Sequence, residues 1–263
     1  MTQQETLTRE VPKKYSEIHE GLKSSDKKIK FVMYLFSDGP KEYDFLLKIL
    51  SMGRDYYWRR TIIERSLSAN SGSSTKNVLD IACGTGLLTF DFARNAGRSV
   101  VGIDVTREML AQALALSKSK RLSSAVEFIQ ARAENLPLRQ DVFDCATISL
   151  ATRNVSSVRA MLGEMKRCVK QSGVVISMDF TRPKGRVFAP FYRFYIFNLL
   201  PALGLIISRH WNGILAYLAG SIKRSKSPEE IEDMMKGTGL VDTSVKRMTR
   251  GVTALVSGVK SKV

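Results

Sequence analysis

From residue 76 onward, the chain alternates between short apolar runs and longer stretches in which apolar positions recur every three or four residues. Short apolar runs bounded by turn residues predict strands, and the longer spacing predicts amphipathic helices. The predicted strands are 77–82, 99–104, 125–130, 143–150, 173–180, 241–248 and 251–260. The predicted helices are 86–96, 106–118, 155–170 and 228–237. This order predicts an α/β fold with a mostly parallel sheet and helices on both of its faces.

Three segments depart from the alternation. Residues 1–25 are polar and of mixed charge, which predicts a tail ahead of one domain that covers residues 26–263. Residues 27–67 follow a helical pattern, and residues 185–224 form an apolar, aromatic, helical insert before the last predicted helix. Because the last two predicted strands follow each other without a helix between them, we expect them to pair antiparallel.

The excess of basic residues indicates what kind of partner the chain binds, and the length of its apolar runs indicates whether it spans a membrane. The chain carries 41 Lys and Arg residues against 25 Asp and Glu, which indicates an anionic partner such as a nucleic acid or a membrane surface. The longest uncharged apolar run, Phe194–Ser208, contains Asn198 and Pro201 and is shorter than the roughly 20 residues of a membrane span. We therefore expect no span.

The cysteines, histidines and first residues point to a cytoplasmic protein. The three cysteines form no C-x-x-C pair and leave an odd thiol, which favours a reducing compartment. The first twenty residues contain four glutamates and no apolar stretch, so no signal peptide is expected. With two histidines in the chain, no histidine-based metal site is expected either.

The segment "NVLDIACGTGLLTF", residues 77–90, joins a predicted strand to a predicted helix through a glycine pair. Such turns suit ligands that approach the backbone closely. The third glycine of the dinucleotide-binding fingerprint is missing, because Thr89 stands at its position. The residues predicted to contact a ligand at this turn are Asp80, Gly84, Thr85 and Gly86.

Two acids distinguish this site from a pyrophosphate site. Asp80 at the first turn would repel a pyrophosphate, whereas it can bind a positively charged amino group. Asp104 ends the second predicted strand, where a carboxylate can accept hydrogen bonds from both hydroxyls of a ribose. These features favour S-adenosyl-L-methionine, which carries an ammonium and a sulfonium. A purely structural tight turn is the alternative interpretation.

The two motifs "VLDIACGTGLLT" and "VVGIDVTREML" resemble the first two motifs of class I S-adenosylmethionine-dependent methyltransferases. More selective segments resemble the ubiquinone/menaquinone biosynthesis C-methyltransferase family, and the similarity runs from about Asp26 to Lys260. These segments are "YDFLLKILSMGRDYYWRR", "AENLPLRQDVFD", "ISLATRNV", "MDFTRP", "FYRFYIFNLLPALG", "YLAGSI" and "TRGVTALVSGVK". The resemblance implies a Rossmann-like class I fold with a seven-stranded sheet, an antiparallel last strand and a helical lid insert.

The resemblance also implies a cofactor, a reaction and a set of cofactor contacts. The cofactor is S-adenosyl-L-methionine, and the reaction is C-methylation of a prenylated quinol, with demethylmenaquinol preferred as the acceptor. The implied cofactor contacts are Thr85, Asp104, Arg132, Ala133 and Ser149. Relatives usually carry Asp or Asn where this chain has Arg132, and arginine has no hydrogen-bond acceptor for an adenine amino group. Glu134 or a backbone carbonyl can take its place.

The residues that follow the fourth predicted strand are the candidates for catalysis. A hydroquinone that loses a phenolic proton gains charge on its ortho ring carbon, and Arg153 is predicted to stabilise that phenolate. Asn154 is its predicted hydrogen-bonding neighbour, or simply the cap of the next helix. Asp179 is predicted to orient Arg153, to act as the base, or to form a structural ion pair. Candidate substrate contacts are Tyr43, Tyr217 and Ser221, with Asp44 beside the first as part of a lid.

The insert and its flanks give the predicted partners. Aromatic and aliphatic residues between Val187 and Ala219 are framed by basic residues, which is typical of a segment that lies on an anionic bilayer. Packing into the core of the domain is the alternative. The expected partners are therefore a prenylated quinol as substrate and the inner face of the membrane as a peripheral contact. Binding to nucleic acid is not expected. A homo-oligomer is left as an open alternative. The alternative functions are methylation of another lipid or aromatic acceptor by the same family and, less favoured, methylation of RNA.

Overall fold

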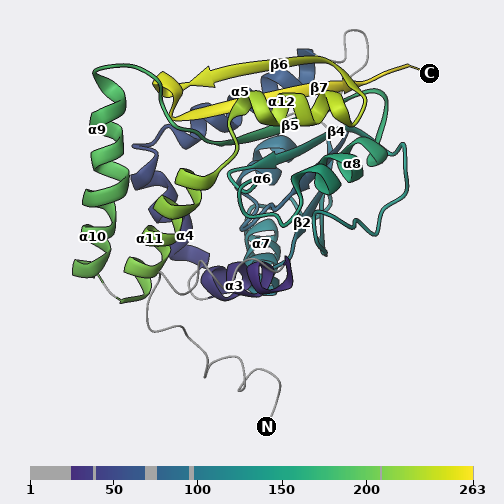
Figure 1. Cartoon of the computed structure of the whole chain (residues 1–263). Helices are drawn as coiled ribbons and strands as arrows, with labels where there is room; N and C mark the ends of the chain where they lie inside the picture. The colour runs from purple at the N-terminus through teal and green to yellow at the C-terminus, as the bar shows by residue number, and fades with distance from the viewer. Residues whose placement is uncertain (1–24, 38–39, 69–75, 95–97, 208, 263) are drawn as a thin grey trace.

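A seven-stranded sheet is the centre of the computed structural model, which describes residues 25–37, 40–68, 76–94, 98–207 and 209–262 (Figure 1). The strands are β1 (Asn77–Ile81), β2 (Ser99–Asp104), β3 (Val126–Gln130), β4 (Phe143–Ser149), β5 (Val169–Phe180), β6 (Leu240–Met248) and β7 (Thr253–Lys260). Their order is β3-β2-β1-β4-β5-β7-β6, and β7 is antiparallel to both of its neighbours whereas the other pairs are parallel. The predicted mostly parallel sheet with an antiparallel last strand is confirmed.

Helices cover both faces of the sheet (Figure 1). They are α3 (Ser25–Ser37), α4 (Pro40–Leu50), α5 (Asp55–Ser68), α6 (Leu87–Arg94), α7 (Arg107–Ser119), α8 (Val158–Cys168) and α12 (Pro228–Gly237). α8 and α12 pack against one face and against each other, whereas α5, α6 and α7 lie on the other face. α3, α4 and α5 occupy the stretch of residues 27–67 that was predicted to be helical.

Alternating residues of the central strands point to opposite faces, as extended backbone requires. In β5, Val174 and Ile176 belong to the apolar cluster on the α5 face, whereas Val175 belongs to the cluster beneath α8 and α12. All three side chains are completely buried. Because both faces are covered, the central strands read in the sequence as continuous apolar runs.

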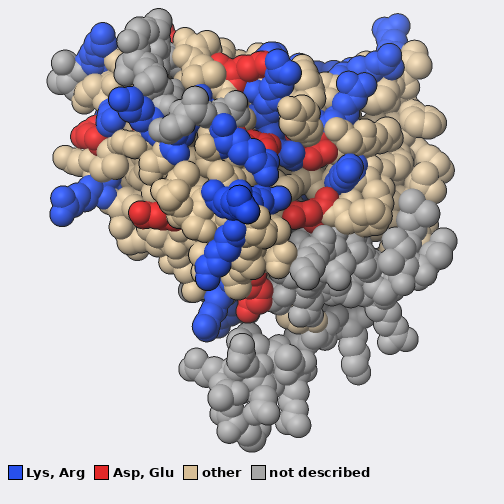
Figure 2. All heavy atoms as spheres, turned by 180° about the vertical axis from the view of Figure 1, so that it is seen from behind, with Lys and Arg blue, Asp and Glu red and all other residues tan. Residues whose placement is uncertain are grey.

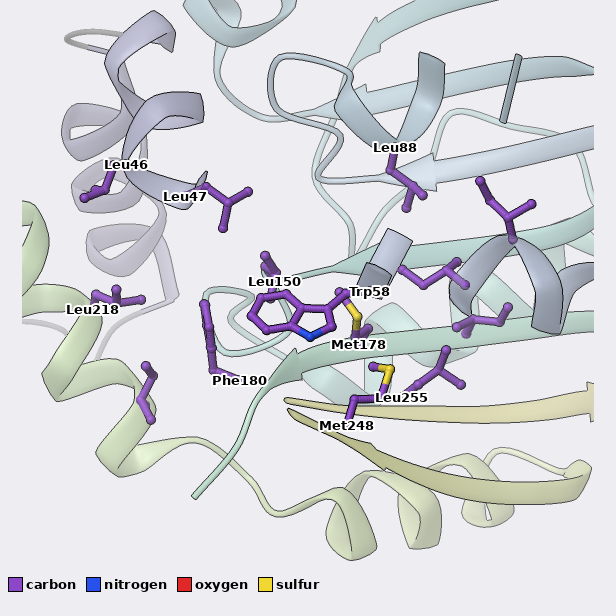
Figure 3. Close-up of a cluster of buried hydrophobic side chains, with 14 of the residues drawn as sticks. Leu46, Leu47, Trp58, Leu88, Leu150, Met178, Phe180, Leu218, Met248 and Leu255 are labelled. Carbon is purple, nitrogen blue, oxygen red and sulfur yellow. The ribbon is translucent and has the colours of Figure 1, made fainter. Parts of the chain in front are cut away.

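Trp58 is the largest buried side chain on the α5 face, and Figure 3 shows its indole beside Leu150 and Met178. Its Nε1 donates a hydrogen bond to Thr249 Oγ1 at 2.8 Å, so the polar end of the ring is satisfied. Phe180 meets the indole edge-on, with ring centroids 5.8 Å apart. One side chain thereby joins α5 to the ends of β4, β5 and β6.

The insert is helical, as the sequence predicts. It consists of α9 (Phe188–Phe194), a π-helical turn η1 (Tyr195–Leu199), α10 (Leu200–Ile207) and α11 (Arg209–Arg224). α9, η1 and α10 follow one another in a single column, and α11 returns beside α10 (Figure 1). No helix in the described part of the chain is long and apolar enough to cross a membrane. Most of the predicted tail, residues 1–24, lies outside the described residues.

The predicted boundaries of α8 and the predicted start of β5 are wrong. The helix expected over 155–170 begins at Val158, because the side chain of Ser157 caps it by accepting a hydrogen bond from Ala160 N at 3.2 Å. The same helix ends at Cys168, and β5 starts directly at Val169, four residues earlier than predicted. Val169 pairs with Phe143 of β4 ahead of a register shift, and this tertiary pairing is not visible in local periodicity.

Candidate active site

A cavity lies at the carboxyl ends of β1, β2 and β4, where ligands bind in open α/β sheets. Its floor comes from the turn between β1 and α6, the end of β2, and the segments after β3 and β4. α3, α4 and α5 close its other side with Ile29, Val32, Leu47 and Trp58. The predicted cofactor residues that line the cavity are Asp80, Gly84, Thr85, Asp104, Arg132, Ala133 and Ser149.

The two glycines of the turn between β1 and α6 have different surroundings. Gly84 has a φ of +56°, and a Cβ placed on it would meet no atom within 4 Å, so its backbone borders open space. Gly86 has a φ of +88° and does not line the cavity. A Cβ there would come within 3.0 Å of the Phe90 ring. Gly86 therefore closes the turn and packs against α6, and its contact with a ligand stays a prediction.

Asp104 joins the end of β2 to the glycine turn. One carboxylate oxygen accepts from Gly84 N at 2.9 Å, and the other accepts from Thr106 N at 2.8 Å. Burial raises the pKa of this carboxyl, although both backbone hydrogen bonds oppose the rise. Each oxygen keeps a second lone pair, so the pair can also accept from the two hydroxyls of a ribose.

Asp80 is buried deeper, with 2% of its surface exposed. It accepts hydrogen bonds from Thr89 Oγ1 at 2.6 Å and from Thr147 Oγ1 at 3.2 Å. Burial raises the pKa of Asp80 to about 6, and the negative charge of Asp104 adds to the rise. A cation in the cavity would stabilise the ionised form, which is the property expected of a site for an ammonium group.

α4 closes over the glycine turn through a polar contact. The hydroxyl of Thr85 donates to Asp44 Oδ1 at 2.7 Å, and burial raises the pKa of Asp44. This contact places Asp44 beside the glycine turn, and the lid role of the "YD" pair stays a prediction. Tyr43 belongs to α4, but its side chain lies outside the described residues.

The opposite end of the cavity contains Arg132 and Glu134. Arg132 is 41% exposed and lies 4.0 Å from Glu134 Oε2. The other Glu134 oxygen accepts from Ser156 N at 2.6 Å, and it also accepts from the Ser156 hydroxyl. Burial alone would raise the pKa of Glu134, but these hydrogen bonds outweigh it and the pKa is lowered. Glu134 is thus an ionised acceptor at the end where an adenine is expected, with one oxygen already engaged.

The charge balance of the cavity fits a cationic ligand. The acids that line it are Asp44, Asp55, Asp80, Asp104 and Glu134. The bases that line it are Arg59 and Arg132, and Arg59 is neutralised by Asp55 and Asp91 at 2.6 Å each. An excess of carboxylates would repel phosphate groups and attract a sulfonium and an ammonium. The residues present therefore fit S-adenosyl-L-methionine.

α5 contributes a part of the cavity wall that the sequence did not predict. Asp55, Trp58 and Arg59 line the cavity, and the first and last form an ion pair across one helical turn. The i,i+4 spacing of opposite charges is visible in "DYYWRR" and predicts a helical pair. Nothing in that spacing indicates that the pair faces the cavity.

The loop after β4 is held in a strained conformation at the cavity wall. Leu150 lines the cavity and has a φ of +56°, which is uncommon for a residue with a branched side chain. Its N–H donates to Met178 O at 2.7 Å, and its carbonyl accepts from the guanidinium of Arg153. Such conformations persist where surrounding contacts enforce them, and they concentrate at functional sites.

Arg153 lies behind this wall and does not line the cavity. Its guanidinium donates to Asp179, to the Leu150 carbonyl and to Ser221 Oγ at 3.2 Å, and it lies over the Phe180 ring at 5.4 Å. Its side chain is only 4% exposed. Asp179 forms the ion pair that was one of its predicted roles, and its oxygens also accept from the backbone N–H groups of Arg153 and Phe180.

Asn154 is the predicted catalytic residue that reaches the cavity. Its Oδ1 accepts a hydrogen bond from the hydroxyl of Tyr217 on α11 at 3.1 Å, so two separately predicted residues that lie far apart in the sequence are brought together. Ser157, not Asn154, caps α8. Tyr217, Ser221, Arg153 and Asp179 line a second cavity on the far side of the loop.

Lys28 is a further residue that sequence analysis missed. It extends from α3 and donates to the carbonyls of Arg153 at 3.1 Å and Val155 at 2.6 Å. Burial lowers the pKa of Lys28, Glu134 opposes this effect, and the positive charges of Arg224 and Arg153 lower the pKa further. No local pattern in "SDKKIKF" distinguishes this lysine from its neighbours.

The chain is similar to known proteins over most of its length. The model of the ubiE/COQ5 methyltransferase family matches residues 22–260. The ubiquinone/menaquinone biosynthesis C-methyltransferase UbiE of Marinomonas sp. (strain MWYL1) is 34% identical over 238 residues, which are 90% of this chain and 93% of that protein. The protein of the same name from Geobacter sulfurreducens is 32% identical and covers 86% of this chain and 87% of its own length.

Solved structures share the fold at low identity. A SAM-dependent methyltransferase from Aquifex aeolicus has a TM-score of 0.54 at 16% identity and covers 76% of this chain and 88% of its own. Phosphoethanolamine N-methyltransferase 2 of Haemonchus contortus, in complex with S-adenosyl-L-methionine, has a TM-score of 0.58 at 16% identity. It covers 79% of this chain and 53% of its own. At this identity the two structures support the class I methyltransferase fold alone.

The raised pKa of Asp80 predicts how stability depends on pH. The folded pKa is about 6 and the ordinary value is 3.8, so the contribution of Asp80 to stability is complete below 3.8 and is lost as pH rises through about 6. Asp80→Asn should therefore raise the free energy of unfolding of the ligand-free protein at about pH 8, relative to wild type, by about 2 kcal/mol more than at about pH 4. Urea unfolding across this range measures the difference.

Asp233→Asn is the matched control, because Asp233 has a 78% exposed side chain. Its unfolding free energy should follow that of the wild type at each pH. Parallel pH curves for Asp80→Asn and wild type would contradict the assignment of a strongly raised pKa to Asp80.

Proposed function

The chain belongs to the ubiE/COQ5 methyltransferase family and is an S-adenosyl-L-methionine-dependent methyltransferase, and from this premise we propose that it methylates a ring carbon of a prenylated quinol. The preferred acceptor is demethylmenaquinol, which would become menaquinol. The observation that carries the proposal is a single cavity that is lined both by carboxylates and by an apolar wall. The apolar wall consists of Leu47, Trp58, Leu88, Leu150 and Met178.

We assign the part of the cavity around Asp80, Asp104 and Glu134 to the cofactor. S-adenosyl-L-methionine, when bound, supplies an electrophilic methyl group on a sulfonium. Asp80 would bind the ammonium of the cofactor, and Asp104 would bind the ribose through the free lone pairs of its oxygens. Ala133, Ser149 and the half-engaged carboxylate of Glu134 remain for the adenine end.

The apolar wall suits a flat aromatic acceptor. Five side chains of this wall carry no polar atom other than the Trp58 Nε1, which is already bonded to Thr249. A quinol that has lost a phenolic proton carries charge on its oxygen and on the ortho carbon. The protein must therefore hold the ring in place and stabilise that oxygen as its charge develops.

Asn154 is the group we assign to the acceptor oxygen. Its carbonyl oxygen already accepts from Tyr217, so its amide N–H groups are left to donate to a ligand in the cavity. The Tyr217 ring is fixed in turn by an edge contact with Phe31 of α3, with centroids 5.3 Å apart. Asn154 would thus be oriented by two elements that lie far from it in the sequence.

We assign Arg153 and Asp179 a positioning role. The guanidinium spans the Leu150 carbonyl, Asp179 and Ser221, so it connects the loop after β4 to the end of β5 and to α11. Both oxygens of Asp179 are engaged, which supports an anchor for Arg153 and not a base. Direct contact of Arg153 with a phenolate would require it to leave one of these partners.

Membrane contact is the remaining part of the proposal. On α9 and the residue before it, Val187, Phe191 and Phe194 are 87%, 73% and 59% exposed and recur at helical spacing. The opposite side of the same segment contributes Tyr192 and Ile196 to the core. One face of the insert is therefore core and the other presents aromatic surface to an interface, which would place the enzyme at the inner face of the membrane.

The basic charge supports a bilayer more than a nucleic acid. On the face that Figure 2 shows, acidic residues lie among the Lys and Arg side chains, whereas a nucleic-acid interface typically has clustered basic charge. Lys184, Arg186 and Arg193 adjoin the exposed face of α9 in the sequence. A polybasic rim around exposed aromatic side chains is the composition of a peripheral membrane contact.

The reaction is tested by incubating the purified chain with methyl-labelled S-adenosyl-L-methionine and candidate acceptors. Reduced short-chain demethylmenaquinone should take up the label on a ring carbon, and total RNA should stay unlabelled. A demethylated benzoquinol of the ubiquinone type is tested as a second acceptor. Which of the two quinols takes up the label decides between the two quinone classes. Label in RNA alone, or in neither quinol, would contradict the proposal.

The role of Arg153 is tested by substitution. Arg153→Ala leaves Asp179 buried without its partner, so it should lose about 3–5 kcal/mol of unfolding free energy together with turnover. Arg153→Lys keeps the charge but cannot hold three partners at once, so it should restore stability better than it restores kcat. The measurements are kcat, KM, thermal melting and cofactor affinity on the same preparations. An alanine variant that melts like wild type, with kcat lowered on the order of 10²–10³, would favour direct contact with the phenolate.

Membrane contact is tested by sedimentation with vesicles. Binding to anionic vesicles should fall as salt rises, because about 1 kcal/mol for each near-surface cation is screened. Phe191→Ser with Phe194→Ser should weaken binding to the same vesicles, and Tyr56→Ser, at an exposed aromatic on α5, is the matched control. Equal binding by the double variant and wild type would exclude the exposed face of α9 as the contact.

A further inference from the structure

The second cavity, behind the loop that follows β4, is assigned neither to the cofactor nor to the acceptor. Among the described residues, it shares Val155 alone with the first cavity. Its volume is about 410 Å³, within the range of small-molecule sites. Residues of α3, β5, β7, α11 and α12 complete its wall. It is therefore a separate space with room for a ligand of its own.

The charge of the second cavity is opposite to that of the first. The cations that line it are Lys28, Arg153, Arg224 and Lys226, and Asp179 is the acid that lines it among the described residues. Asp179 is already engaged by Arg153 in the buried ion pair. Positive charge is therefore in excess along the described part of this wall, whereas carboxylates outnumber bases in the first cavity.

Lys28 shows that these positive charges act on one another. Its Nζ donates to two neutral acceptors, the carbonyls of Arg153 and Val155, and neutral carbonyls do not cancel the charge of an ammonium. Burial lowers the pKa of Lys28, although the charge of Glu134 opposes this effect. The positive charges of Arg224 and Arg153 lower the pKa of Lys28 further. An anion in the cavity would relieve this repulsion.

Arg224 and Lys226 lie at the solvent edge of the cavity, because both residues are exposed. The backbone around them is held by Arg182, whose guanidinium donates to the carbonyls of Lys223 and Ser225 at 3.3 Å each. The carboxylate of Glu230, on which the charge of Lys226 also acts, already accepts from Ser227 N at 2.6 Å. A ligand can therefore reach the two cations from solvent without a rearrangement of the core.

Hydroxyl groups form much of the remaining polar lining, but most of them already donate their hydrogen to an acceptor within the protein. The hydroxyls engaged in this way are those of Ser156, Thr181, Tyr217, Ser221 and Ser225. A neutral polar ligand would find few donors here. Guanidinium and ammonium groups are the donors that suit a phosphate, which accepts several charge-assisted hydrogen bonds at once.

We propose that the second cavity binds a phosphate group through Lys28, Arg224 and Lys226. A guanidinium can hold two phosphate oxygens together, and each ammonium adds a compact positive charge. The phosphate belongs to a soluble phosphate compound or to the headgroup of an anionic phospholipid, and the recognising chemistry is the same for both. Because Lys28 also holds the loop after β4, a bound phosphate would stabilise the folded protein around that loop.

The test is calorimetric titration of the purified chain with sodium phosphate at constant ionic strength. Wild type should bind phosphate at one saturable site. Arg224→Gln with Lys226→Gln should weaken the affinity at least about tenfold, the factor for the loss of one charge-assisted hydrogen bond. The melting temperature of wild type should rise with phosphate more than that of the double variant. Cofactor and acceptor are left out, so the outcome is independent of the proposed function.

Lys223→Gln with Lys246→Gln is the matched control, because both residues are exposed, neither lines the cavity, and the same charge is lost. This variant should bind phosphate like wild type. Sedimentation with vesicles of phosphatidylcholine and phosphatidylglycerol separates the two sources. Weaker vesicle binding by the cavity variant than by the control, with no calorimetric binding of phosphate, would assign the site to a lipid headgroup. Equal losses in the two double variants, or no phosphate binding together with equal vesicle binding, would overturn the inference.

Discussion

The buried ion pair between Arg153 and Asp179 is the interaction on which the acceptor half of the site depends. Removing two charges from water is costly, and a buried pair is tolerated only when its remaining hydrogen-bonding capacity is used. Here the guanidinium also bonds to the Leu150 carbonyl and Ser221, and the carboxylate also accepts two backbone N–H groups. The end of β4, the end of β5 and α11 are therefore fixed relative to one another by one network.

The consequences of this network reach the cavity through the backbone. Leu150 keeps its left-handed conformation because its carbonyl and its N–H are both bonded, and it forms part of the apolar wall. Asn154 follows directly after Arg153, whose carbonyl also accepts from Lys28 of α3. A residue behind the wall thus determines what faces the ligand. In the proposed reaction, Arg153 would position the loop and the amide of Asn154 would contact the ring oxygen.

The cavity has an excess of acidic residues, whereas the chain as a whole has an excess of basic residues. The chain has a net charge of +16, yet the cavity is lined by more carboxylates than bases, and burial raises the pKa of three of them, Asp44, Asp80 and Asp104. A cationic ligand would relieve the repulsion inside, and under the proposed function an anionic bilayer would complement the outside. In the insert, one side of α9 packs against the core and the other is exposed.

The sequence by itself determined the strands, most helices, the glycine turn and the residues that end β1 and β2. Period-two and period-3.6 patterns and glycine conformations are local properties, so they can be read without neighbours. Motif positions such as Asp80, Asp104 and Asn154 lie at strand ends, and parallel strands bring their carboxyl ends together in any fold of this class.

Only the tertiary structure decided where the longer side chains point. Arg153 turns away from the cavity because Asp179, Ser221 and the Leu150 carbonyl, from three separate elements, satisfy it there. Lys28 is distinguished from its neighbours by two carbonyls more than a hundred residues away. Such orientations depend on which distant groups meet in space, and a local sequence pattern does not predict those groups.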